Sequence, residues 1–127
     1  MTENEIAKII VDAAYRVHVT LGPGLFESAY QRALVYELRK RKLKVVPEHP
    51  IDIVYDGVNL GEAFRADIIV NDKVIIELKS VEQVAKVHKK QLLTYLRLTN
   101  KHLGLLINFG APLIKHGITR IVNGLKD

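Results

Sequence analysis

The chain has 127 residues, of which 48% are hydrophobic and 26% are charged, the balance of an ordinary globular domain rather than of a disordered or membrane chain. Its formal net charge of +5 suits a polyanionic partner, but many proteins without such a partner carry as much. The absence of cysteine excludes disulfides, thiolate metal sites, iron–sulfur clusters and cysteine nucleophiles, so any metal must be held by oxygen or imidazole.

Two amphipathic helices are predicted in the first third of the chain. Apolar residues recur at three- and four-residue steps from Glu3 to Leu21, and Gly22-Pro23-Gly24 ends this helix. A second helix is predicted from about Phe26 to Lys42, with basic residues gathered at its C-terminal end. This basic run, continued by Lys44, could contact a polyanion, but cations at the end of a helix also complement its dipole.

The middle and the end of the chain are predicted to form strands around a third helix. Pro47 and Pro50 forbid a long helix after Leu43, and an Asp56-Gly57 turn follows the first apolar run. A hairpin rich in Ile and Val comes next, as expected of central strands covered by helices on both sides. The predicted strands cover residues 51–55, 64–70, 73–78, 103–108 and 117–122, and helical periodicity returns over residues 84–99.

This order of elements indicates one domain over residues 1–127 with an α/β core, or α+β by some schemes, in which helices flank a mixed central sheet. The crossover through the third helix should join two parallel strands. The apolar runs are too short to cross a bilayer and the N-terminus does not resemble a secretory signal, so a soluble cytoplasmic protein is expected.

Three charged residues lie in otherwise apolar strands and need an explanation, because burying an unpaired charge costs several kcal/mol. Asp67 belongs to one strand of the predicted hairpin, and Glu77 and Lys79 end the other on a shared face. Two carboxylates and an amine brought together could hold a hard cation such as Mg²⁺ and position a water. On spacing alone, a cross-strand salt bridge at the end of a hairpin explains the same residues equally well.

The two explanations differ in what they require of the strand register. A two-residue turn at Asn71-Asp72 would send Asp67 and Glu77 to opposite faces of the sheet. A three-residue loop over residues 71–73, or a bulge, would place both carboxylates on one face, directed into a cleft beneath Glu27 and Gln91. A shared metal therefore predicts an odd-length loop or a bulge.

An Asp on one strand followed by Glu-x-Lys on the next, in this order of elements, resembles the PD-(D/E)XK nuclease superfamily of restriction enzymes and Holliday-junction resolvases. The resemblance is closer to the GxxExxY family, whose signature is similar to Gly24-Leu25-Phe26-Glu27-Ser28-Ala29-Tyr30. It extends from about His18 to Val122 and includes the stretches Gln91–Tyr95 and Gly104–Gly110. The fold that the resemblance implies is a restriction-endonuclease-like core.

The resemblance also implies roles for single residues. Asp67 and Glu77 would be metal ligands, Glu27 would be a further carboxylate ligand from the second helix, and Lys79 would stabilise the attacking hydroxide. Gln91 and Tyr95, one helical turn apart, are similar to a Gln-x-x-x-Tyr pair that lies beside the catalytic carboxylates of RecB-like nucleases. From the residues alone, Glu27 could instead complement a helix dipole, and Tyr95 could be core packing.

Three other polar residues fall within the stretches that resemble the family. Tyr30 could pack in the core, donate a hydrogen bond to the site or contact a phosphate. His18 and Arg65 are expected to be structural.

The function implied is hydrolysis of phosphodiester bonds in nucleic acid, expected to be DNA, with Mg²⁺ or Mn²⁺ as cofactor. The main alternative is a module of the same fold that binds nucleic acid or a protein without cleaving. A small-molecule metal hydrolase is a third reading, because a fold does not fix a substrate. No membrane partner is expected, and a domain of this size would often need to form a homodimer to span a duplex.

Overall fold

The computed structural model describes residues 1–126 and begins with two packed helices, α1 (Glu3–Leu21) and α2 (Glu27–Lys40). A capping box starts α1, because the Thr2 side chain accepts from the Glu5 N–H while Glu5 reaches back to the Thr2 N–H. Both helices are where the apolar periodicity predicts them. No helix within residues 1–126 is both long enough and apolar enough to span a bilayer.

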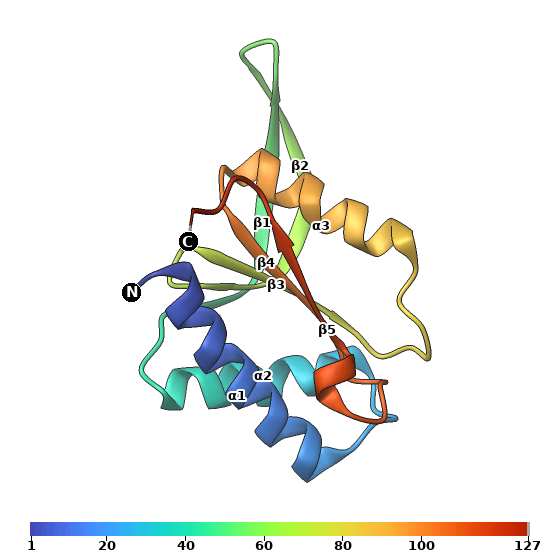
Figure 1. Ribbon diagram of the computed structural model, residues 1–127. Helices are drawn as coiled ribbons and strands as arrows, with labels where there is room; N and C mark the ends of the chain where they lie inside the picture. Colours follow the sequence, from blue (N-terminus) through green and yellow to red (C-terminus); the bar gives the residue numbers. More distant parts are fainter. Residues whose placement is uncertain (127) are drawn as a thin grey trace.

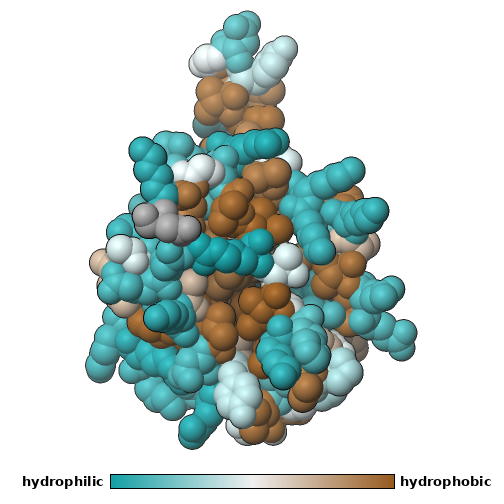
Figure 2. All heavy atoms as spheres, in the orientation of Figure 1, coloured by the Kyte–Doolittle hydropathy of each residue, from teal (hydrophilic) through white to brown (hydrophobic). Residues whose placement is uncertain are grey.

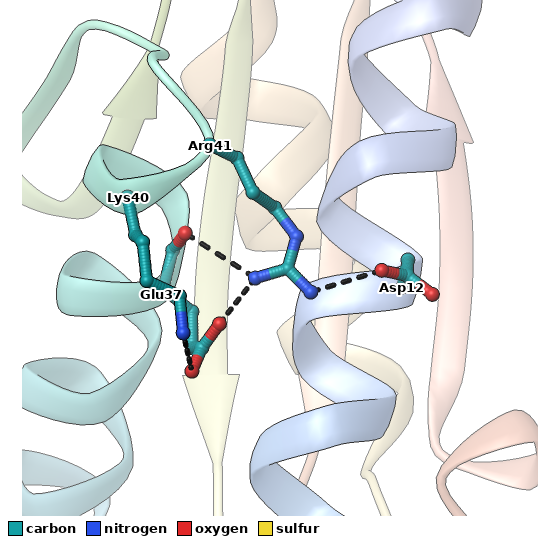
Figure 3. Close-up of polar contacts among 4 residues, drawn as sticks. All are labelled: Asp12, Glu37, Lys40 and Arg41. Atoms are coloured by element: carbon teal, nitrogen blue, oxygen red, sulfur yellow. Dashed lines mark hydrogen bonds and ion pairs between the residues drawn. The ribbon is translucent and has the colours of Figure 1, made fainter.

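Arg41, just after α2, joins the two helices (Figure 3). Its guanidinium donates to Asp12 of α1 at 2.9 Å and also pairs with Glu37, one turn back on α2. Lys40 pairs with the same Glu37 carboxylate at 3.3 Å. Part of the basic run at the end of α2 therefore holds the helix pair together.

A five-stranded sheet follows, with the strand order β1-β2-β3-β4-β5. All neighbours are antiparallel except β3 and β4, whose parallel pairing confirms the predicted crossover through α3. The strands are β1 (Val45–Tyr55), β2 (Val58–Val70), β3 (Val74–Lys79), β4 (Leu103–Asn108) and β5 (Ile118–Val122), with α3 (Lys86–Thr99) and a 3-10 helix (Ile114–His116) in the last two connections.

Helices cover both faces of the sheet, as the fold prediction requires (Figure 1). The larger core joins α1 and α2 to one face and includes Ile10, Leu34 and Ile76. The smaller core joins α3 to the other face through Leu92, Leu96 and Ile75. β4 is buried along its whole length because it lies between these two layers.

The first two strands are longer than predicted. β1 begins at Val45 rather than Ile51 and contains both prolines, which an edge strand tolerates because its outer N–H groups have no ladder partner. β2 begins at Val58 rather than Phe64. Residues 51–64, from the second half of β1 to the first half of β2, form a hairpin arm that projects from the body around the predicted Asp56-Gly57 turn (Figures 1 and 2).

The register between β2 and β3 is the one that a shared metal site requires. Val70 pairs with Val74 and Ile68 with Ile76, so residues 71–73 form the connection. Asn71 and Asp72 have φ values of 50° and 56°, left-handed conformations that Asn and Asp tolerate in turns. The prediction of an odd-length loop is confirmed.

Candidate active site

The site lies where β2 and β3 separate. Their ladder ends at Ile68 and Ile76, while β2 continues beside β1 and β3 continues beside β4. Two carboxylates occupy the opening in place of ladder bonds. Asp67 Oδ2 accepts from the Leu78 N–H at 2.8 Å, and Glu77 Oε1 accepts from the Asp67 N–H at 3.3 Å. This opening, between Asp67 and Leu78, is called the fork below.

Side-chain alternation along β2 also breaks at the fork. Ala66 packs in the layer of α3, whereas Ile68, two residues on, packs in the layer of α1 and α2. A regular strand would place both on one face. Asp67 lies at this break, between the layer of α1 and α2 and the layer of α3.

The paired carboxyl groups of Asp67 and Glu77 retain a proton. Burial, and then the negative charge of Asp67, raise the pKa of Glu77 to about 9. Burial also raises the pKa of Asp67, although the hydrogen bond from the Leu78 N–H opposes this. Two carboxylates this close cannot both ionise cheaply, so at neutral pH the pair shares one proton when no cation is present.

A cavity of about 220 Å³ opens beside Asp67 on the side of α2. Glu27 and Glu48 line it with Asp67, and their negative charges help to raise the pKa of Asp67. Gln31 fixes one wall, because its Nε2 donates to Glu48 Oε1 at 2.8 Å and to the Asp67 carbonyl at 2.9 Å. We call this space the acidic cavity; it is lined by Glu27, Ser28, Gln31, Glu48, Asp67 and Leu78.

Glu77 and Lys79 belong to the opposite side of the fork. They share a face of β3 with Ile75, which packs in the α3 layer, and the Lys79 charge favours the ionised form of Glu77. Tyr95 of α3 lies near both carboxylates, since its burial and then the charges of Glu77 and Asp67 raise its pKa. Its ring stacks on Phe64, with centroids 3.6 Å apart.

The segment after Lys79 is fixed by Asn108 at the end of β4. The buried Asn108 side chain accepts from the N–H groups of Val81 and Gly110, each at 3.0 Å, and donates to the Val81 carbonyl at 2.8 Å. Gly110 must be small, because a Cβ there would lie 2.3 Å from the Val81 oxygen. Ser80 adds a bond of 2.6 Å to the Leu25 carbonyl, just before Glu27.

A model of the PD-(D/E)XK nuclease superfamily matches residues 4–121, nearly the whole described chain. The chain belongs to this superfamily. No curated protein and no solved structure matches it significantly. The mixed sheet flanked by helices is the arrangement expected of a PD-(D/E)XK fold, with Asp67, Glu77 and Lys79 at the fork.

The donor set of this PD-(D/E)XK chain suits a magnesium ion that the substrate helps to bind. Within residues 1–126, no three His, Asp or Glu side chains are gathered closely enough to form a ready metal cage. Mg²⁺ seldom requires one, because it is commonly held by one or two carboxylates together with water and substrate oxygens. Asp67 and Glu77 supply such a pair, whose shared proton a cation would displace.

The fork brings together most, but not all, of the residues singled out in the sequence. Glu27 reaches Asp67 through the acidic cavity, whereas Glu77 meets Asp67 from the α3 side. Gln91 is exposed on α3 and does not line the acidic cavity. A cleft beneath both Glu27 and Gln91 was expected. Of these two residues, only Glu27 lines the acidic cavity on the α2 side.

Two other residues near the PD-(D/E)XK site are structural. Tyr30 stacks on Phe109 with centroids 4.4 Å apart, while its hydroxyl donates to the Gly22 carbonyl and accepts from the Leu25 N–H, closing the loop that leads to Glu27. His18 is buried, and its Nε2 lies 2.8 Å from the Ala111 carbonyl oxygen. Of the three roles considered for Tyr30, the structure shows packing in the core.

The sequence reasoning missed Glu48, Gln31 and Asn108. Gln31 could have been found, because it lies one helical turn after Glu27 and shares its face. Asn108 ends an entirely apolar strand, which marks it as a polar group that needs partners. Glu48 gave only a weak signal, a carboxylate between two prolines, and its φ of 52° became visible only in the structure.

Proposed function

We propose that the chain is a metal-dependent nuclease that hydrolyses phosphodiester bonds in DNA at the fork between β2 and β3. The observation that carries this proposal is the juxtaposition of Asp67 and Glu77, with Lys79 two residues on, in a member of the PD-(D/E)XK superfamily. The Gly24–Tyr30 stretch supports placing the chain in the GxxExxY family of that superfamily.

Asp67 and Glu77 are the proposed metal ligands, and Glu27 the third, acting across the acidic cavity. A bound Mg²⁺ or Mn²⁺ would lower the pKa of a water and neutralise charge on the scissile phosphate. Lys79 orients and stabilises the attacking oxygen, because its ammonium shares a strand face with Glu77 and cannot itself bind a cation. Lys79 is therefore assigned to the nucleophile.

Tyr95 and Gln91 are proposed to act from the α3 side. The Tyr95 ring is held by Phe64, and burial followed by the nearby carboxylates raises the pKa of its hydroxyl above the ordinary value, so the hydroxyl is protonated at neutral pH. It can therefore donate a hydrogen bond to a phosphate oxygen near Glu77. Gln91, one turn earlier on α3 and exposed, is proposed to contact the same strand of DNA further out.

A cleavage assay with a Lys79→Ala variant tests the function. We expect wild type to cut plasmid, linear or single-stranded DNA in Mg²⁺ or Mn²⁺ and not in EDTA. Lys79→Ala should lose about 10²-fold or more in rate, the loss typical of one oriented electrostatic group, while it still binds Mn²⁺. Lys8→Ala, which removes an exposed cation from α1, is the matched control.

Two results would count against this function. Cleavage by Lys79→Ala at the wild-type rate would remove the role given to Lys79. DNA binding by a wild-type protein that cleaves none of the three substrates would favour a binding module instead. Any homodimer that spans a duplex should appear in the same preparations as a mass of twice 14.3 kDa.

A further inference from the structure

A second hollow, of about 780 Å³, lies between α2 and β1 and adjoins the acidic cavity. Gln31 and Glu48, which are hydrogen bonded to each other, line both spaces and lie where the two spaces meet. We call the larger space the α2 groove; it is lined by Gln31, Arg32, Val35, Tyr36, Arg39, Lys40, Pro47 and Glu48. Nothing in the proposed nuclease mechanism uses its far end.

The α2 groove combines an apolar, aromatic floor with a cationic rim. Val35 and Pro47 form apolar lining, and Tyr36 leaves 65% of its surface exposed. Arg32 makes no ion pair with any residue from 1 to 126, so its guanidinium is available to a ligand. The Lys40 ammonium nitrogen lies 5.5 Å from the centroid of the Tyr36 ring.

Charge along this path changes sign from one end to the other. The far end carries Arg39 and Lys40, about two helical turns beyond Gln31, and Arg32 lies on the rim next to Gln31, whereas the end that meets the acidic cavity carries Glu48. A polyanion would be attracted to the far end and repelled from the near end until a divalent cation offset the carboxylates. This is the order expected of a channel that delivers a phosphate to a metal site.

We propose that the α2 groove binds a single strand of nucleic acid and leads its backbone to Asp67. A base stacks on Tyr36, while Arg32 and Lys40 contact the flanking phosphates. A duplex is the poorer fit, because its paired bases are stacked on one another and cannot lie on a side-chain ring. The inference rests on the proposed nuclease function in that the groove ends at the site where cleavage would occur.

A competing occupant is the hairpin arm of a second copy. Val54, Tyr55, Val58 and Leu60 expose 55–70% of their surface on the arm, and Asp52 and Asp56 carry charge opposite to that of the groove. The nucleic acid is favoured because the groove carries the basic charge of Arg32, unpaired within residues 1–126, and adjoins the acidic cavity, a position beside the candidate site that a protein arm would not need. The same experiment distinguishes the two occupants.

The test is fluorescence anisotropy with a labelled oligothymidine and with a duplex of equal length, in EDTA so that neither is cut. Wild type should prefer the single strand. Tyr36→Ala should weaken that binding by roughly five- to a hundredfold, the loss of one stacked base. Arg32→Ala should reduce the slope of log affinity against log salt by about 0.7, the loss of one phosphate contact on a single strand.

The matched controls are Tyr15→Ala and Lys8→Ala, exposed residues of α1 that should bind the oligonucleotide as wild type does. A preference for the duplex, or unchanged binding by Tyr36→Ala and Arg32→Ala, would overturn the inference. If the wild type is a dimer, and Tyr36→Ala dissociates it without changing oligonucleotide binding, then the occupant of the α2 groove is the hairpin arm of a second copy.

Failure of the groove and failure of the nuclease proposal give different results. If cleavage depends on a metal but is unaffected by Tyr36→Ala and Arg32→Ala, the proposed role of the α2 groove is wrong and the proposed nuclease activity stands. If a single strand binds through Tyr36 and Arg32 but is not cleaved with any metal, the proposed role of the α2 groove stands and the proposed nuclease activity is wrong.

Discussion

The buried position that suits Glu77 to bind a metal makes its ionised form destabilise the metal-free folded protein. In metal-free protein its pKa of about 9 lies above the ordinary value of 4.5, so the folded state holds a proton that the unfolded chain releases between these values. The stability contributed by this proton is fully present below about pH 4.5 and is lost as the pH rises through 9. Stability should therefore fall with rising pH across this window.

Glu77→Gln should flatten that dependence and raise the free energy of unfolding at pH 9 by roughly 1–3 kcal/mol, the usual penalty of an uncompensated buried polar group. Urea unfolding in EDTA at pH 5, 7 and 9 measures this. Glu62→Gln, which alters an exposed carboxylate on the hairpin arm, should leave the slope unchanged. Parallel curves for wild type and Glu77→Gln would show that Glu77 is ionised in the folded protein.

Glu27 and Glu48 are exposed carboxylates that approach Asp67 across the acidic cavity. Glu27→Gln removes a proposed metal ligand and should weaken Mn²⁺ binding by at least about tenfold, whereas Glu48→Gln removes a group that only supports Asp67 and should weaken it by up to about tenfold. Asp67→Asn should weaken it much more. Calorimetric titration with Mn²⁺ measures the three affinities. If Glu27→Gln binds Mn²⁺ with unchanged affinity, Glu27 is not a metal ligand and only stabilises the first turn of α2.

At the scale of elements, the segment after β3 depends on a single side chain. Asn108→Ala would leave the Val81 and Gly110 backbone groups without their partner and should cost roughly 1–3 kcal/mol in stability. It should also reduce the rate of cleavage, because Lys79 immediately precedes the released segment. Asn59→Ala, in the exposed hairpin arm, is the control. Thermal unfolding and cleavage rates test both effects; wild-type values for both would contradict the role given to Asn108.

Elements with strong periodicity or burial could be predicted from the sequence, and those on the periphery could not. α1 and β4 lie where their apolar patterns place them, because each buries a continuous surface. In the hairpin arm, residues 51–55 and the Asp56-Gly57 turn were predicted, but residues 58–63 were not, because nearly all of them are exposed and their burial does not alternate regularly. The Asn71–Lys73 loop was predictable from chemistry alone, since a shared site tolerates only one register.

At the scale of the whole molecule, the candidate site depends on contacts that sequence spacing does not reveal. Asp67, Glu77 and Lys79 could be predicted because they are charged residues in apolar strands. Glu48 could not, because it meets Asp67 only when β1 pairs with β2 and α2 packs beside them. The same packing creates the α2 groove from residues that read, in the sequence, as the basic end of a helix.

The central claim, that Asp67 and Glu77 share a divalent metal, is tested most directly by a crystal structure of the protein soaked in Mn²⁺. Anomalous diffraction would locate the ion. We expect a peak bound by the carboxylates of both Asp67 and Glu77. A peak bound elsewhere, or no peak at saturating Mn²⁺, would contradict the shared metal.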